Sequence, residues 1–199
     1  MLTECVHFMR RRLFLAGPDE CGKSEMIQQA LGNLMGQAGG FITVRERDEQ
    51  GNIVGYDMVA ADGSGQSGRF LENVNGKPVT HLEVFSHVGA KLLKHAQDKP
   101  FAVLDELGGA ELLDDGFVQS LVQLIKTKTP CIGVVKGLGQ PGKAVGVMGL
   151  NLRYELARKV MYDFMTRDSD TMVLETTGLN DTEVMEKVHQ WVAEYAQIL

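Results

Sequence analysis

The segment LFLAGPDECGKSEMIQQAL, residues 13–31, constrains the fold of this chain more than any other. Four residues separate Gly17 from the Gly-Lys-Ser triplet that begins at Gly22. This GxxxxGK[ST] spacing is that of a phosphate-binding loop (Walker A), and it is informative only between a strand and a helix. The apolar run before the loop predicts a buried strand, and apolar residues at helical spacing after it predict a helix over 23–37. The chain is therefore expected to contain a strand, phosphate loop and helix in succession.

Backbone N–H groups in such a loop and in the first helical turn converge on phosphate oxygens. Lys23 is expected to act in catalysis by reaching the β- and γ-phosphates of a nucleoside triphosphate, ATP or GTP, and Ser24 is expected to bind Mg²⁺. A carboxylate at Glu20 is repelled by phosphate if it faces inward, so we expect this side chain to point outward to water. The residues assigned to nucleotide binding are Gly17, Pro18, Asp19, Glu20, Cys21, Gly22, Lys23, Ser24 and Glu25.

A second chemical signal is the stretch FAVLDELGG, residues 101–109, an apolar strand that ends in two carboxylates (Walker B). Asp105 is expected to hold Mg²⁺ through water. Glu106 is expected to polarise the attacking water as a general base. We expect another strand, residues 131–135, to lie between the phosphate-loop strand and this acidic strand. Lys136 then ends near the γ-phosphate as a third catalytic residue, with a solvated lysine as the alternative.

Predicted strands and helices alternate along the chain, which indicates a mainly parallel sheet covered on both faces. Two β-rich runs within residues 39–63 flank a turn cluster and predict a β-hairpin, whereas residues 62–80 predict a loop with a short strand. The fold class is therefore α/β, a three-layer P-loop NTPase fold with an inserted hairpin, and one domain over 1–199. The other predicted helices are 82–97, 116–127, 152–166 and 181–198, and the other strands are 99–109, 130–135 and 171–176.

The composition of the chain indicates which classes of binding partner to expect. A net charge of -6 disfavours nucleic acid and anionic membranes as partners, and no apolar run is long enough for a membrane span. Three cysteines without a CxxC pair favour the reducing cytoplasm. The nucleotide is thus the expected partner, and a protein partner is left open. Met9 is an alternative translation start, which makes residues 1–8 a loosely held extension.

Three segments resemble successive blocks of the cancer-related nucleoside-triphosphatase family, which is known in archaea, bacteria and animals. They are LFLAGPDECGKS, GGFITVRERDEQGNIVGYDMV and FAVLDELGGAELLDDGF, and the resemblance covers residues 13–60 and 100–135. It implies slow Mg²⁺-dependent hydrolysis of several nucleoside triphosphates. Carried over, it places Gly17, Gly22, Lys23 and Ser24 at phosphate and Mg²⁺, and Asp105 and Glu106 at metal and water.

Glu111 matches an acidic position of the same block, and its role stays open. The chain departs from the family at two places. Glu20 replaces a glycine of the loop. After residue 135, KGLGQPGKAVGVMGL replaces a stretch rich in histidine and arginine.

Two other functions fit the sequence. One is a small nucleotide or metabolite kinase, in which Lys136, Lys143, Arg153 and Arg158 would belong to a basic lid over an acceptor. The other is a sensor that binds ATP or GTP without hydrolysing it and signals to a partner protein. A kinase turns over faster when its acceptor is added, whereas a sensor binds nucleotide and releases little phosphate.

Overall fold

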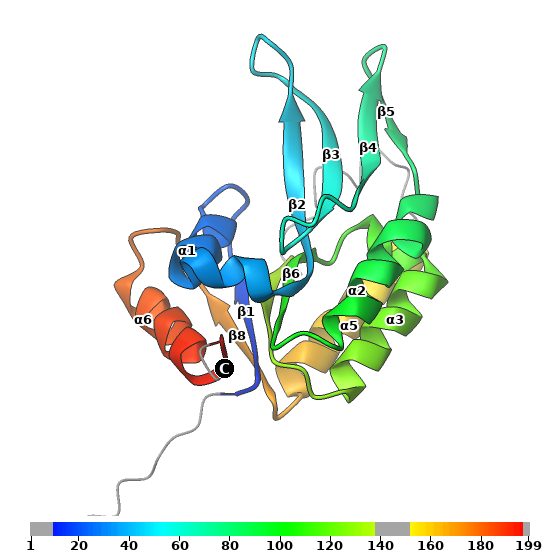
Figure 1. Cartoon of the computed structure of the whole chain (residues 1–199). Coiled ribbons are helices and arrows are strands. Elements are labelled where there is room, and N and C mark those ends of the chain that lie inside the picture. Colours follow the sequence, from blue (N-terminus) through cyan, green and yellow to red (C-terminus); the bar gives the residue numbers. More distant parts are fainter. Residues whose placement is uncertain (1–9, 138–151, 197–199) are drawn as a thin grey trace, which may run out of the picture.

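A computed structural model describes residues 10–137 and 152–196 of the chain (Figure 1). The predicted extension 1–8 and Lys143 of the predicted lid lie outside these residues. The strands are β1 Arg12–Ala16, β2 Gly39–Arg47, β3 Ile53–Ala60, β4 Ser67–Val74, β5 Lys77–Thr80, β6 Ala102–Leu107, β7 Cys131–Val135 and β8 Thr171–Glu175. The α-helices are α1 Lys23–Leu31, α2 Ala90–Ala96, α3 Asp115–Lys126, α5 Leu152–Arg167 and α6 Thr182–Trp191.

All eight strands form one sheet, in the order β5-β4-β3-β2-β6-β7-β1-β8. The neighbours from β2 to β8 in this order pair in parallel, and those from β2 to β5 pair antiparallel. The strand β7 lies between the phosphate-loop strand β1 and the acidic strand β6, which confirms the predicted order. The carboxyl ends of these three strands therefore meet at one edge of the sheet.

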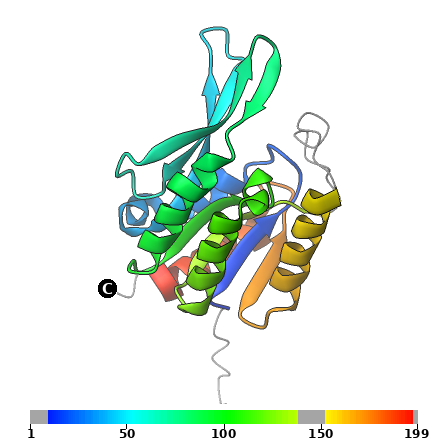
Figure 2. The same cartoon turned by 90° about the vertical axis from the view of Figure 1, so that its right-hand side faces the viewer.

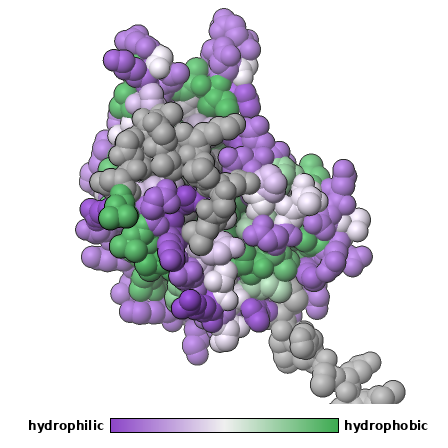
Figure 3. Space-filling model, turned by 180° about the vertical axis from the view of Figure 1, so that it is seen from behind, coloured by the Kyte–Doolittle hydropathy of each residue, from purple (hydrophilic) through white to green (hydrophobic). Residues whose placement is uncertain are grey.

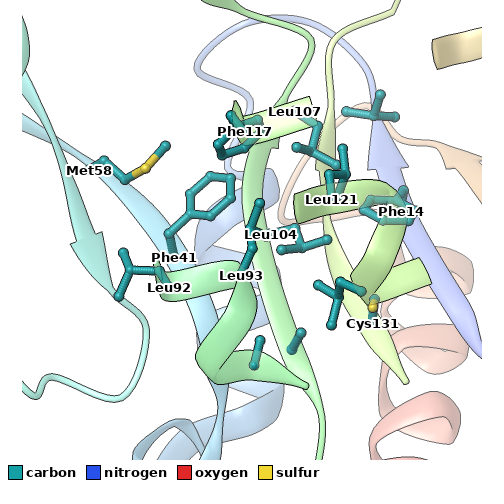
Figure 4. Close-up of a cluster of buried hydrophobic side chains, with 14 of the residues drawn as sticks. Phe14, Phe41, Met58, Leu92, Leu93, Leu104, Leu107, Phe117, Leu121 and Cys131 are labelled. Atoms are coloured by element: carbon teal, nitrogen blue, oxygen red, sulfur yellow. The ribbon is translucent and has the colours of Figure 1, made fainter. Parts of the chain in front are cut away.

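Side chains alternate between two cores along the central strands. Leu13 and Leu15 of β1 pack on one face with α1 and α6, whereas Phe14 and Ala16 pack on the other with α2, α3 and α5. Figures 1 and 2 show these two groups of helices on opposite faces of the sheet, which gives the predicted three layers. Figure 4 shows the second core, in which Phe14, Leu104 and Cys131 of neighbouring strands lie beneath side chains of α2 and α3.

The antiparallel strands extend beyond the parallel part of the sheet, as Figures 1 and 2 show. We call residues 42–80, the outer part of β2 with β3, β4 and β5, the β lobe. The expectation of mainly loop over residues 62–80 is wrong, because β4 and β5 form a second hairpin there. Gly68 explains the error: a Cβ at this position would lie 2.7 Å from Cγ1 of Val84, so packing requires a residue that usually weakens strands.

One predicted helix ends earlier than expected, and two others contain a π turn. The helix predicted over 23–37 stops at Leu31, where Gly32 adopts a φ of 50°, and a 3₁₀ turn continues over Gly32–Gln37. The C-terminal helix α6 is followed by a π turn over Val192–Ala196. The helix predicted over 82–97 begins with another π turn, over Phe85–Gly89.

Hydrophobic side chains also reach the surface. Figure 3 shows green hydrophobic areas within a mainly purple surface on the back of the molecule. Along α5, four exposed hydrophobic residues recur at every fourth position: Leu152, Leu156, Val160 and Phe164. Within residues 10–137 and 152–196, no helix combines the length and hydrophobicity needed to cross a membrane.

The spacing of β6 and β7 generates a prediction about stability. A Cβ at Gly133 of β7 would lie 2.1 Å from the backbone oxygen of Leu104 in β6. We expect Gly133→Ala to lower the free energy of unfolding by about 1–3 kcal/mol, because the strands must separate to admit the methyl group. Urea denaturation checks this value, with Gly36→Ala as control, because nothing lies within 4 Å of a Cβ at Gly36. Equal stability of the two variants would contradict the strand spacing.

Candidate active site

The phosphate loop is pressed against the connection between β8 and α6. Gly17 and Gly22 have φ values of 145° and 96°, which L-residues with a side chain rarely adopt. A Cβ at Gly17 would lie 2.2 Å from the oxygen of Thr176, and one at Gly22 would lie 2.7 Å from Cγ of Leu179. Both glycines are therefore required by backbone conformation and by the close approach of this neighbouring segment.

Lys23 is the first residue of α1 and is buried at the base of the loop. Its ammonium donates hydrogen bonds to the carbonyl oxygens of Gly17 (3.1 Å) and Pro18 (2.5 Å). Cys21 Sγ lies 3.8 Å from Nζ of Lys23. Within the described part of the chain, no side chain caps the N-terminus of α1. Its first N–H groups are thus placed to bind an anion.

Asp105 lies at the end of β6, directly beside the start of α1. Its carboxylate accepts a hydrogen bond from the hydroxyl of Ser24. Burial raises the pKa of Asp105 to about 7; the charges of Glu106 and Glu25 also raise it, whereas Ser24 and Lys23 lower it. Burial therefore disfavours the charged form of this carboxylate more than Ser24 and Lys23 favour it.

The pair Ser24 and Asp105 fits Mg²⁺, which takes oxygen ligands and is commonly held by one or two carboxylates together with substrate phosphates and water. A cation beside Asp105 would also offset the acidic charge that raises its pKa. Among the described residues, no cluster of three or more His, Cys, Asp and Glu side chains could hold a metal by itself.

Glu106 and Lys136 form an ion pair across the ends of β6 and β7, with 2.7 Å between Oε1 and Nζ. Burial disfavours the charge of Lys136, but Glu106 outweighs it together with Glu111 and raises the pKa of this lysine. Lys136 is therefore a cation at the sheet edge, next to the carboxylate assigned to the attacking water. This placement agrees with the position predicted from the sequence.

Glu111 and Tyr154 fix the turn that follows β6. The buried carboxylate of Glu111 accepts hydrogen bonds from the N–H groups of Gly108 (2.6 Å) and Gly109 (2.8 Å). Tyr154 of α5 donates its hydroxyl to the oxygen of Gly108 at 3.0 Å. Glu111 thus positions the turn beside Glu106. Sequence reasoning missed Tyr154, because a tyrosine within an amphipathic helix carries no signal for such a contact.

The side chain of Glu20 is exposed to water, as predicted, but it extends toward β2. Its side chain is 57% exposed and pairs with Arg45 of β2, with 3.1 Å between Oε1 and Nη1. The backbone of Glu20 has a φ of 60°, the left-handed conformation that glycine adopts most easily. The family glycine at this position is therefore explained by geometry, and Glu20 adopts the same backbone conformation at an energetic cost.

A cleft of about 780 Å³ connects these groups. It runs from the phosphate loop and the sheet edge to the inner side of the β lobe. Gly17, Pro18 and Cys21 do not line it: the carbonyls of Gly17 and Pro18 hold Lys23 instead. The predicted site residues that line it are Asp19, Glu20, Gly22, Lys23, Ser24, Glu25, Asp105, Glu106 and Lys136.

The prediction of a basic lid is wrong for two of its residues, Arg153 and Arg158. Arg158 is buried: its Nη2 donates to the oxygen of Gly137 at 2.9 Å, and its guanidinium lies 5.5 Å from the ring centre of Tyr154. Arg153 pairs with Asp115 of α3 at 2.9 Å. Neither arginine lines the cleft. The reason is that α5 packs on the sheet from its second turn onward, which directs Arg158 inward.

The strand order, the strained loop before α1 and the acidic end of β6 together define a P-loop α/β nucleotide-binding protein. Comparisons with known proteins identify the family. A model of the NTPase family matches residues 12–143. The chain belongs to this family, which confirms the resemblance seen in the three sequence segments.

Two relatives illustrate the similarity. The cancer-related nucleoside-triphosphatase homolog of Mus musculus is 30% identical over 158 residues, which cover 70% of this chain and 82% of that protein. Nucleoside-triphosphatase THEP1 of Thermotoga sp. (strain RQ2) is 26% identical over 138 residues, covering 65% of this chain and 76% of that protein.

Two solved structures share the fold. The solution structure of a human cancer-related nucleoside triphosphatase has a TM-score of 0.62 and 22% identity, covering 89% of this chain and 95% of that one. The crystal structure of THEP1 from Aquifex aeolicus has a TM-score of 0.58 and 15% identity, covering 89% of this chain and 96% of that one.

The burial of Asp105 generates a prediction for the protein in the presence of a chelator. Between pH 4 and 7 the folded protein retains a proton that an unfolded aspartate, with a pKa near 4, has released. Stability therefore falls as the pH rises through this window. From pH 5 to pH 8, we expect the free energy of unfolding to fall by about 1–3 kcal/mol more in wild type than in Asp105→Asn. Urea denaturation at both pH values measures this; an identical pH dependence would contradict it.

The conformation of Glu20 generates a second prediction. We expect Glu20→Gly to raise the free energy of unfolding by about 0.5–1 kcal/mol, because relief of left-handed strain outweighs loss of an exposed ion pair. Glu20→Gln, which removes the charge and keeps the strain, is the control and should give no such gain. Thermal and urea unfolding compare the variants, and a glutamine variant as stable as the glycine variant would refute the strain.

Proposed function

We propose that this protein is a Mg²⁺-dependent nucleoside triphosphatase that binds ATP or GTP and releases a diphosphate and phosphate. The observation that carries the proposal is the meeting of Lys23, Ser24, Asp105, Glu106 and Lys136 at one edge of the sheet. The printed names of the relatives, nucleoside-triphosphatases, support it. We further propose that one domain over residues 1–199 carries this activity.

In this proposal the phosphate loop binds the triphosphate with its backbone. Lys23 exchanges the carbonyl oxygens of Gly17 and Pro18 for β- and γ-phosphate oxygens, which are stronger acceptors because they are charged. Ser24 and Asp105 would hold Mg²⁺, which would supply positive charge that neutralises the phosphates. Ser24 and Asp105 already contact each other, so both are placed for one shared ion.

Glu106 and Lys136 have separate roles in the proposed hydrolysis. Glu106 orients the attacking water and takes its proton, while the water oxygen bonds to the γ-phosphorus and the bond to the bridging β-phosphate oxygen breaks. Lys136 holds Glu106 at 2.7 Å and lies at the cleft. We propose that Lys136 moves to the γ-phosphate when the nucleotide binds. It would thereby replace the family's basic stretch after β7 and release Glu106 for the water.

Charge and cysteine content indicate the binding partner and the cellular location. A net charge of -6 favours the nucleotide over nucleic acid or an anionic membrane as partner. Cys21 and Cys131 are both free thiols, which fits a reducing compartment. We propose a cytoplasmic location on this basis.

The test is phosphate release from ATP, GTP, CTP and UTP, with and without Mg²⁺. We expect Glu106→Gln to lower kcat by about 10²–10⁴-fold while nucleotide affinity stays within about threefold, because the base acts on water and not on binding. Glu186→Gln on α6 is the matched control, because Glu186 is exposed and lies outside the cleft. A full rate in Glu106→Gln would remove its assigned role, and no release by wild type would contradict hydrolysis by this chain alone.

A further inference from the structure

The cleft of about 780 Å³ has the size of a site for small molecules and is not confined to the phosphate loop. Beyond Glu106 it continues along the inner side of the β lobe. Its walls there include Tyr56, Met58 and Phe70, so this half is apolar and aromatic.

The strand order shows which end of a bound triphosphate faces this half. Asp105 and Glu106, which serve the γ-phosphate in the proposed function, lie on β6 next to β2 and the β lobe. The connection between β8 and α6 contacts the phosphate loop from the opposite side. The γ-phosphate thus points toward the β lobe and the nucleoside points away from it. The aromatic half therefore lies on the γ-phosphate side of the site.

The aromatic wall is fixed by the core. Phe85 and Phe117 are buried with ring centres 6.1 Å apart, Phe70 lies 5.2 Å from Phe85, and Tyr56 lies 6.2 Å from Phe70. Tyr56 and Phe70 are partly exposed and line the cleft. A planar ring can stack on such side chains whatever its base identity.

Basic groups lie beside this wall. Arg45 and Arg47 of β2 both line the cleft. Arg45 reaches Glu20 of the phosphate loop at 3.1 Å, so its guanidinium lies at the boundary between the loop and the β lobe. Arg47 is exposed and donates to the oxygen of Gly51 at 2.7 Å. Arg45 thus lies next to the phosphate loop, and Tyr56 is its cross-strand neighbour on β3.

We infer that the β-lobe half of the cleft binds a second substrate, a nucleoside monophosphate, that accepts the γ-phosphoryl group. This inference rests on the proposed function of the phosphate loop and adds a competing nucleophile to it. An oxygen of the acceptor phosphate bonds to the γ-phosphorus, and the bond between that phosphorus and the bridging β-phosphate oxygen breaks. The electron pair remains on the nucleoside diphosphate, and the dianionic acceptor has no proton to lose. Water reacts when the acceptor is absent.

The experiment incubates the full chain and Mg²⁺ with γ-³²P-labelled ATP or GTP and with AMP, GMP, CMP, UMP or dTMP in turn. Chromatography separates labelled nucleoside diphosphate from labelled phosphate. We expect label on at least one nucleoside monophosphate. Tyr56→Leu and Phe70→Leu, which keep an apolar side chain and remove the ring, should each raise the KM of that acceptor by about tenfold or more. Phe164→Leu on the exposed face of α5 is the matched control and should leave it within about twofold.

The outcomes separate the two proposals. Labelled phosphate without any labelled nucleoside diphosphate overturns the acceptor site and leaves the hydrolase intact. If neither labelled product forms, both proposals are overturned. Hydrolysis without acceptor, measured for every variant, reports on the phosphate-loop site itself. If Tyr56→Leu and Phe70→Leu lower hydrolysis as much as transfer, or if neither raises the acceptor KM, the separate acceptor site is refuted.

Discussion

An excess of acidic charge at the carboxyl edge of the central strands is the constraint on which the site depends. Among the residues that the structure describes, Asp105, Glu106 and Glu111 meet there with Lys23 and Lys136. Buried charges are costly unless they are paired, and burial is the main reason why the pKa of Asp105 is raised. A magnesium-bound nucleotide would neutralise these charges, because the ion pairs with the carboxylates while the lysines pair with the phosphates.

The fold creates this constraint through the order of its strands. Because β7 lies between β1 and β6, Lys136 ends beside Glu106 and both face the loop that precedes α1. The helix α5 then supports the edge from behind through the hydroxyl of Tyr154. The β lobe adds a second wall and turns the edge into a cleft.

Much of this could be predicted from the sequence, because the chemistry of the site follows strand ends. The phosphate loop and Asp105 are local patterns, and apolar periodicity locates most helices. What could not be predicted depends on contacts between distant segments. Arg45 lies 25 residues from its partner Glu20, and Tyr154 lies 46 residues from Gly108. The strand β4 resembles a loop in sequence because its glycine, Gly68, serves packing against a helix.

The most direct test of the site is a crystal structure of this chain with Mg²⁺ and a non-hydrolysable nucleoside triphosphate analogue. We expect the ion on Ser24, with Asp105 in its water shell. Lys136 should have left Glu106 for a γ-phosphate oxygen, and Glu106 should hold a water in line with the γ-phosphorus. A structure in which Lys136 still pairs with Glu106 and makes no contact with the γ-phosphate would contradict this charge exchange.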